Sequence, residues 1–354
     1  MRRGVWFFLP LLLLAVFGMG PVWGQGVKLS GKASALPAQK VAAFEAALKM
    51  ARGGSRGAQY DVGVMYEQGE GVSANSARAA RWYEEAAMQG HVRAEASLGR
   101  LYFEGRGVPA DKRKAQDWFE RAAGKNDVYS QHSLGMMLFD SAQTNEEEAA
   151  AAAWLVRAAE QGFAPAQASL GVLFRDGRGV RADDVEAVKW FRRAAMQHYA
   201  DGLFYLAGMN EAGRGVRENL PRAASLYRDA AAQSHAGACF ALAKLYDLGL
   251  GVTQSSSEAA KWYAKAAGLN FLPAQFALGV SFLEGTGVAK DTATGIEWIR
   301  RAAEAGFVPA QVFLGNAYEA GRFVKQSPVE SVKWFEKAAA QGSQEARVKL
   351  DMLQ

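Results

Sequence analysis

The sequence predicts an all-α solenoid of eight 36-residue helix–turn–helix repeats with a capping half-repeat at each end. An Ala-Ala pair recurs in every repeat, from Ala86-Ala87 to Ala338-Ala339. A Gly-x-Gly-Val segment, such as the one that begins at Gly105, recurs intact six times in the same register. Outside the N-terminal segment, every tryptophan occupies one position of the period: Trp82, Trp118, Trp154, Trp190, Trp262, Trp298 and Trp334.

The first helix of a repeat is predicted by apolar residues four positions apart. Leu98 and Tyr102 share one face of the helix expected over 94–103. Gly105 follows it, and glycine can adopt the left-handed conformation that closes a last helical turn. The glycines in the middle of these helices, such as Gly99, each cost about 1 kcal/mol relative to alanine. We therefore expect a neighbouring helix to pack closely there, with the Ala-Ala pairs as its contact.

The second helix of a repeat is predicted by residues that favour the N-cap position. Capping boxes are expected where a glutamate follows three positions later, at Glu186, Glu258 and Glu330. The third repeat departs from the pattern, because its loop over 141–145 lacks both glycines and Glu147 stands at the cap position. We interpret most of the tryptophans as core. The predicted caps are Asn75, Asp111, Asp183, Asn219, Ser255, Asp291 and Ser327.

The ends of the chain divide into an export signal, a flexible lead-in and two caps. Arg2 and Arg3 precede an apolar run over 5–17, and small residues follow, which is typical of a secretory signal peptide over 1–24 cleaved after Gly24. The same stretch is long enough to be an uncleaved inner-membrane anchor. We expect a lead-in over 25–37, a capping helix within 38–56, the repeats over 57–342 and a capping helix over 343–354.

The repeat pattern resembles the Sel1-like repeat family. Its elements are Ala-x-x-x-Leu-Gly-x-x-Tyr from Ala94, the loop from Gly105, the cap Asp111, and Trp118 with its Ala-Ala pair. The resemblance implies a right-handed α/α superhelix, related to tetratricopeptide solenoids, whose usual role is protein–protein interaction. For an exported bacterial member it implies a periplasmic or secreted scaffold or regulator with a protein partner in the cell envelope.

Catalytic chemistry is not predicted. No serine has a lysine three positions later, as serine-type penicillin-reacting enzymes require. The four histidines lack the spacing of a metal site, and we expect no catalytic, cofactor-binding or metal residues. The single Cys239 is interpreted as a small core residue. Two alternatives stay open from family precedent: an enzyme acting on cell-wall or β-lactam substrates, and a secreted host-directed effector.

A protein partner is expected at the concave face, which first helices line in helical solenoids. The net charge of +5 is small, so it does not favour nucleic-acid binding. Membrane insertion is expected only if the signal stays uncleaved. Side chains that vary between repeats are the candidate binding residues: Met65, Arg100, Met136, Met137, Tyr205, Met209 and Lys244.

Overall fold

The computed structural model describes residues 37–353, and every element in that range is an α-helix. The predicted signal segment and residues 25–36 of the lead-in lie outside it. The first helices of the eight repeats are α2 (Arg56–Gln68), α4 (Val92–Glu104), α6 (Val128–Ser141), α8 (Ala164–Asp176), α10 (Ala200–Ala212), α12 (Ala236–Leu248), α14 (Leu272–Glu284) and α16 (Val308–Ala320). The second helices are α3 (Ser76–Met88), α5 (Lys112–Gly124), α7 (Asn145–Glu160), α9 (Asp184–Met196), α11 (Leu220–Ala232), α13 (Ser256–Gly268), α15 (Thr292–Glu304) and α17 (Pro328–Ala340).

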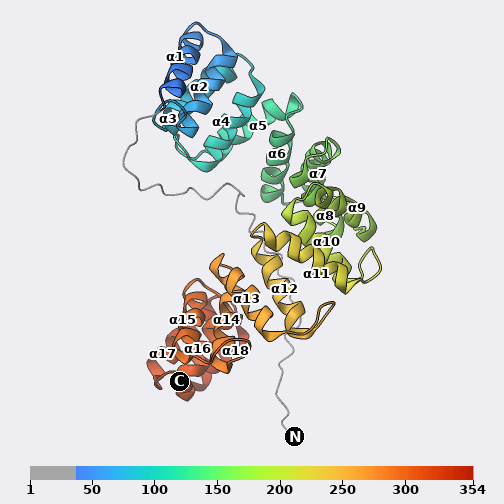
Figure 1. Cartoon of the computed structure of the whole chain (residues 1–354), viewed down its shortest axis with the longest axis vertical. Helices are drawn as coiled ribbons and strands as arrows, with labels where there is room; N and C mark the ends of the chain where they lie inside the picture. The colour runs from blue at the N-terminus through green and yellow to red at the C-terminus, as the bar shows by residue number, and fades with distance from the viewer. Residues whose placement is uncertain (1–36, 354) are drawn as a thin grey trace.

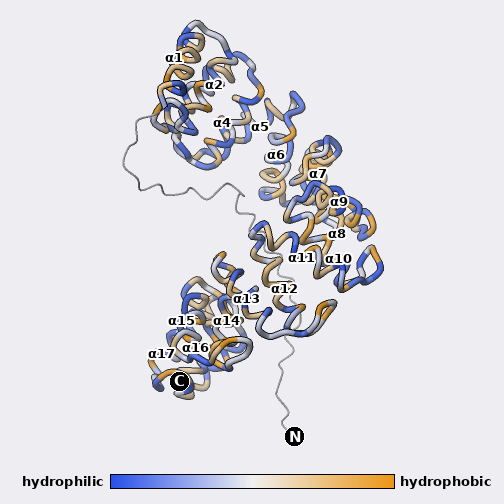
Figure 2. The backbone as a smooth tube through the Cα atoms, in the orientation of Figure 1, coloured by the Kyte–Doolittle hydropathy of each residue, from blue (hydrophilic) through white to orange (hydrophobic). Residues whose placement is uncertain are grey.

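The repeats stack into an open, curved superhelix (Figure 1). Each first helix packs against its own second helix and against the second helix of the preceding repeat. In the middle of the arc, α6 and α8 lie toward the opening of the curve, whereas α7 and α9 lie on the outer side (Figure 1). Hydrophobic and hydrophilic residues alternate along each helix, as expected for helices that bury one face (Figure 2).

The second helices begin at side-chain caps, as predicted. All seven predicted cap residues accept a hydrogen bond from the first turn of their second helix. In repeat three the cap is Thr144, whose Oγ1 accepts from the Glu147 N–H. The Glu147 carboxylate in turn accepts from the Thr144 N–H, which completes a capping box. The glutamates of the three predicted boxes instead pair with lysines three positions on: Lys189, Lys261 and Lys333.

The loop glycines have two different roles. Gly105 has a φ of 66° and ends α4, as predicted. Gly107, the second loop glycine, lies against the backbone at Ser76, in the first turn of α3 in the preceding repeat. A Cβ at this position would overlap that backbone. The second glycine therefore lets the loop of one repeat pack against the preceding repeat. The loop both reverses the chain and joins two repeats.

The mid-helix glycines do pack closely, but not against the Ala-Ala pairs. A Cβ on Gly171 would lie 2.5 Å from the Phe191 ring, and one on Gly99 would lie 2.8 Å from Phe119. The partner is thus the residue that follows the tryptophan. The Ala-Ala pair contacts the next repeat instead, since a Cβ on Gly202 would lie 2.5 Å from the Ala194 Cβ.

The tryptophans are less buried than predicted. Only Trp334 is buried, at 4% exposure, and the other six are partly exposed. An Arg or Lys three positions later lies over six of the seven rings, as Arg193 does 4.3 Å from the Trp190 centroid. The buried ring is again the next residue, such as Phe119 or Phe191. A partly exposed tryptophan with a cation over its face thus covers the edge of the core.

Incomplete repeats close both ends of the described chain. Helix α1 (Ala38–Arg52) packs on α2 as a second helix packs on the next first helix, and Ala51 takes the place of an Ala-Ala residue. Helix α18 (Gln344–Leu353) packs on α17 and buries Ala346. Over residues 37–353, none of the helices has both the length and the apolar character that crossing a membrane demands.

Candidate interaction surface

Buried glutamines join consecutive repeats. We call Gln59, Gln131, Gln167, Gln275 and Gln311 the glutamine ladder. All five are at most 6% exposed, and each donates from Nε2 to a carbonyl eight residues earlier, at the end of the preceding second helix. In four of the five, Oε1 accepts from a glutamine 30 residues later, as in the 2.8 Å bond from Gln161 to Gln131. Buried polar groups are normally hydrogen-bonded. The paired amide nitrogens and oxygens of the ladder therefore hold consecutive repeats in a fixed orientation.

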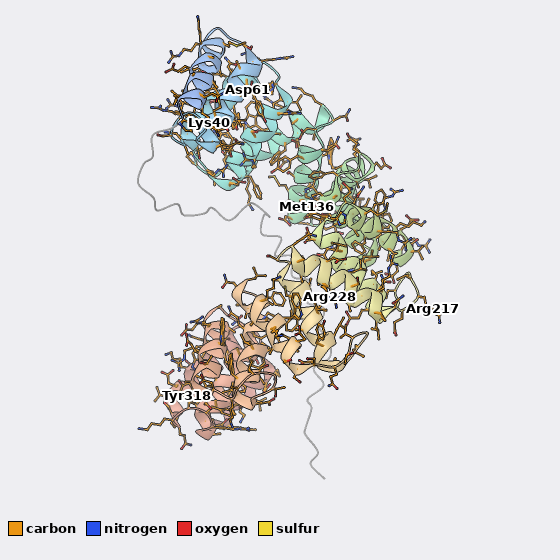
Figure 3. The ribbon with its side chains drawn as sticks, viewed as in Figure 1. Lys40, Asp61, Met136, Arg217, Arg228 and Tyr318 are labelled. Carbon is orange, nitrogen blue, oxygen red and sulfur yellow. The ribbon has the colours of Figure 1, made fainter. Side chains whose placement is uncertain are left out.

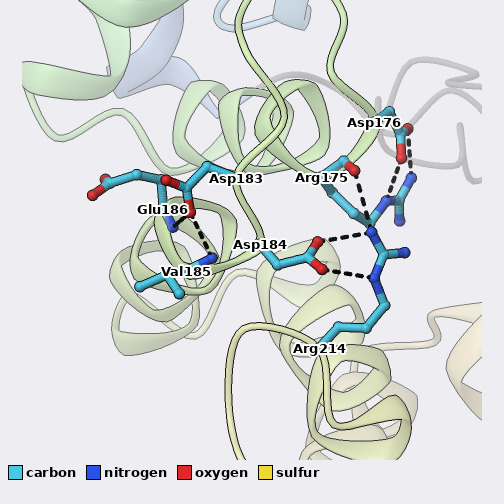
Figure 4. Close-up of polar contacts among 7 residues, drawn as sticks. All are labelled: Arg175, Asp176, Asp183, Asp184, Val185, Glu186 and Arg214. Carbon is cyan, nitrogen blue, oxygen red and sulfur yellow. Dashed lines mark hydrogen bonds and ion pairs between the residues drawn. The ribbon is translucent and has the colours of Figure 1, made fainter.

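Ion pairs between repeats also hold the outer edge. Arg214, in the loop of repeat five, makes a bidentate pair with Asp184 at the start of α9, with N–O distances of 2.7 and 3.0 Å (Figure 4). It also donates to the carbonyl of Arg175. Arg178 pairs with Glu148 in the equivalent way one repeat earlier. These contacts tie the loops of repeats four and five to the preceding second helix, next to the close approach of the second loop glycine.

Aromatic rings follow the first helices from repeat to repeat. A ring in the first turns of one first helix contacts the ring of the N-cap residue of the next. Phe204 stacks on His235 with centroids 4.5 Å apart, and Phe240 contacts Phe271 at 5.4 Å. These rings are half-exposed, so the array presents them at its surface. We call them the aromatic ladder: Tyr60, His91, His132, Phe163, Phe204, His235, Phe240, Phe271, Phe276 and Phe307.

His235 also carries a polar contact within the aromatic ladder. Its Nδ1 accepts from the Ala238 N–H and caps α12, so its Nε2 faces Asp201 at 3.2 Å. Burial alone would raise the pKa of Asp201, but hydrogen bonds from His235 and Tyr199 outweigh it and hold this pKa below its usual value. The surface therefore contains a carboxylate fixed among rings.

Carboxylates pair with buried tyrosines wherever the residue after the tryptophan position is tyrosine. Tyr83 donates to Glu67, Tyr227 to Glu211 and Tyr263 to Asp247, at 2.7 to 2.8 Å. Burial, with the adjacent carboxylate, raises the pKa of Tyr227 and Tyr263, which therefore remain protonated donors. Glu67 also pairs with Arg100 and Arg106, which makes a compact charged cluster in repeats one and two.

The geometry described above is that of a known repeat. The Sel1 repeat model matches residues 57–91, 92–127, 128–163, 164–199, 200–235, 236–271, 272–307 and 308–343. The chain belongs to the Sel1-repeat family. Members of this family are generally protein-binding helical solenoids.

Two solved structures share the fold over most of the chain. One is a protective antigen with an SLR fold from uropathogenic Escherichia coli strains, 32% identical, with a TM-score of 0.66 over 87% of this chain. The chain spans 66% of that antigen's length. The other is a Sel1 repeat protein from Oxalobacter formigenes, 30% identical, with a TM-score of 0.65 over 88% of this chain and 91% of its own. Among curated proteins, none matches the chain.

The Sel1 register sorts the seven predicted binding residues into three positions. Arg100, Met136 and Lys244 are equivalent and half-exposed, and Met136 lies on the inner side of the bend (Figure 3). Arg100 has a side chain that is 12% exposed and pairs with Glu67 and Glu104. Tyr205 is half-exposed and stacks on Phe191 at 5.2 Å. The third position holds Met65, Met137 and Met209.

The third position faces the core, so Met209 was wrongly included among surface residues. Met209 is 3% exposed and packs with Val188, Phe191 and Leu206. Its equivalents in repeats two, four and six, Leu101, Leu173 and Leu245, are buried as well. Met65 and Met137 are half-buried and pack against core clusters. Variation between repeats did not separate this position from the surface position one residue earlier.

One serine–histidine pair was missed by the sequence reasoning. His132 Nε2 lies 3.2 Å from Ser169 Oγ, from adjacent repeats. Burial lowers the pKa of His132 to about 4, which makes it a weak base, and Ser169 is only 4% exposed. Nucleophilic catalysis needs a base matched to the working pH and an accessible nucleophile. Over residues 37–353, no three His, Cys, Asp or Glu side chains gather as a metal site would need.

The aromatic ladder was also missed, although its signal is present in the sequence. Phe163, Tyr199, His235, Phe271 and Phe307 recur at 36-residue spacing just before the first helices. Serine and aspartate are the usual caps, and repeats one and three begin their first helices with Ser55 and Asp127. Aromatic residues at a cap position therefore indicate a packing or binding role beyond capping.

Proposed function

We propose that this protein is an exported scaffold of the bacterial cell envelope that binds a partner protein through the inner surface of the solenoid. The observation that carries the proposal is the aromatic ladder. Half-exposed rings run along the first helices through most of the repeats, on elements that lie toward the opening of the arc in its middle. Aromatic side chains supply much of the binding energy at protein interfaces.

The first helices carry aromatic residues that structural needs do not explain. Tyr205 and Phe313 occupy equivalent positions, whereas repeats six and seven have Ala241 and Ala277 there. Alanine at this position is compatible with the fold, so the large rings are not required for packing between repeats. Phe313 extends the aromatic ladder by contacting Phe276 at 5.8 Å and Phe323 at 6.2 Å.

The export part of the proposal rests on the N-terminal sequence. Arg2 and Arg3, the apolar run over 5–17 and the small residues up to Gly24 support a cleaved secretory signal. N-terminal sequencing of the protein from fractionated cells tests this. A mature chain beginning at Gln25 in the periplasm or medium is expected, whereas a full-length chain in the membrane fraction would favour an inner-membrane anchor.

The binding experiment compares two variants that keep the fold. Tyr205→Ala with Phe313→Ala removes two inner rings and copies the residues of repeats six and seven. Arg217→Ala removes an exposed charge on the outer side of the arc (Figure 3). Both are used for capture from envelope extract, and crosslinks are mapped on the recovered partner.

We expect the double variant to lose the partner by about tenfold or more, while Arg217→Ala retains it. Crosslinks should fall on first-helix residues. Equal loss in both variants, or crosslinks confined to second helices, would contradict binding at the inner surface.

A further inference from the structure

One member of the glutamine ladder lacks its partner. Gln275 is 6% exposed, and its Nε2 donates to the Ala267 carbonyl as the other members do. Its Oε1 is buried and has no donor among residues 37–353. The position that holds a glutamine in five other repeats, at Gln89, Gln161, Gln197, Gln233 and Gln341, is Ala305 here. A buried acceptor without a donor is costly, so this site differs from its equivalents by a missing chemical group.

A pocket marks the place of that missing group. It measures about 440 Å³ and lies between α13, α14 and α15. Gln275 lines it together with Asn270, Trp298, Arg301 and Ala305. The backbone at Ala305 (φ −77°, ψ 4°) matches that at Gln161 (φ −76°, ψ 3°), and a glycine follows each. The backbone at Ala305 therefore has the conformation that carries the glutamine side chain in repeat three.

The four filled sites show which group the pocket would accept. In each, a primary amide nitrogen donates to Oε1 of the ladder glutamine at 2.7 to 2.9 Å. Its second N–H donates to a backbone carbonyl, that of Arg157 for Gln161 and that of Gly162 for Gln197. The equivalent carbonyls in repeat seven belong to Arg301 and Asn270, and both residues line the pocket. An amide with two N–H groups satisfies the site, and one without them does not.

We propose that this pocket binds a primary carboxamide, supplied by a glutamine side chain of the bound partner. The partner as the source rests on the proposed scaffold function, whereas the carboxamide chemistry follows from the chain's own four filled sites. Trp298 would cover the apolar part of such a side chain, since its ring is half-exposed at the pocket.

Titration of the ¹⁵N-labelled full chain with propionamide, followed by NMR, tests the chemistry. We expect saturable shifts at Ala305 and Gly306, and none with N,N-dimethylpropionamide, which has no N–H. Ala305→Gln should abolish the response, because its own amide would occupy the pocket. Absence of saturable shifts, or equal shifts with both amides, would overturn the proposal and leave water as the donor to Gln275.

A second variant keeps the test valid if Ala305→Gln behaves unexpectedly. Gln275→Leu removes the acceptor and copies Leu203, which is 4% exposed at the equivalent position of repeat five. It should also abolish the propionamide response, and a retained response would count against Gln275 as the recognition group.

The source is tested with two capped peptides, acetyl-Gly-Gln-Gly-N-methylamide and its Glu counterpart. Tighter binding of the Gln peptide than of propionamide supports a polypeptide ligand, and equal or weaker binding overturns that assignment. These measurements need no partner protein, so failure to capture a partner leaves their result unaffected.

Discussion

The residue that follows the tryptophan position determines which residue fits in the middle of the facing first helix. Its side chain fills the space left by a mid-helix glycine, which explains why a residue that disfavours helices recurs there. Repeats five and six have Ala207 and Ala243 in place of the glycine, so the requirement for glycine applies to individual repeats and not to the whole array. The glycine pattern could be predicted from the sequence, but its partner could not, because Phe, Tyr, Leu and Ile all occupy that position and hide its periodicity.

Gly171→Ala should destabilise the protein by about 1–3 kcal/mol, because the new Cβ would meet the Phe191 ring in a tightly packed core. Gly124→Ala is the matched control, since Gly124 is also helical and a Cβ there would contact nothing within 4 Å. It should gain up to about 1 kcal/mol from helix propensity alone. Urea unfolding measures both. If Gly171→Ala is as stabilising as the control, the packing argument is wrong.

His132 should make stability depend on pH. Its pKa is about 4 in the folded state, because of burial, and 6.5 otherwise. Between these values the unfolded chain binds more protons, so the free energy of unfolding rises as pH increases from 4 to 6.5. The difference corresponds to about 3 kcal/mol. His132→Ala, which copies Ala96 and Ala168 in equivalent positions, should flatten this slope in urea unfolding at several pH values. An unchanged slope would assign the dependence to other groups.

In several repeats, the residue after the tryptophan position on the second helix is complementary to the residue that faces it on the first helix. Tyrosine after the tryptophan position occurs with Glu67, Glu211 or Asp247 on the facing first helix, whereas Ile299 faces Leu283. Helix positions, caps and left-handed glycine ends could be predicted from the sequence, because each depends on a few adjacent residues. The glutamine ladder could not, because its bonds join residues 30 apart in the chain that belong to different repeats.

Tyr227→Phe should cost about 1–3 kcal/mol, since it leaves the Glu211 carboxylate without its donor from α11. Adding Glu211→Leu should recover most of the loss, because the pair then resembles Ile299 and Leu283 in repeat seven. Thermal or urea unfolding of the two single variants and the double variant gives the coupling energy. Additive costs would mean that the hydrogen bond does not couple the two helices.

The whole array is a chain of similar junctions, and its weakest junction is predicted at repeat three. The loop over 141–145 lacks the second glycine that six other loops have, and it lacks an arginine like Arg178 or Arg214, which pair with the preceding second helix. Long-range contacts in a solenoid join only neighbours, so a weak junction is not compensated from elsewhere. The curvature that brings the first helices to one side was expected from the repeat pattern, but its extent depends on junction geometry.

Hydrogen exchange should reveal this junction. Peptides from α5, which precedes the altered loop, should exchange faster than equivalent peptides from α9, against which Gly215 and Arg214 pack. Both helices have an aspartate cap and the same length, so they are a matched pair. Slower exchange in α5 than in α9 would contradict a weak junction.

The second loop glycine has a consequence for how such proteins change in size. This glycine packs against the first turn of the second helix in the preceding repeat, so an insertion of a few residues would break that contact. Loss or duplication of a whole 36-residue unit joins equivalent surfaces and keeps the contact between each loop and the preceding second helix. Unequal recombination between repeats can therefore lengthen or shorten this protein in discrete steps, and copy number sets the length of its inner surface.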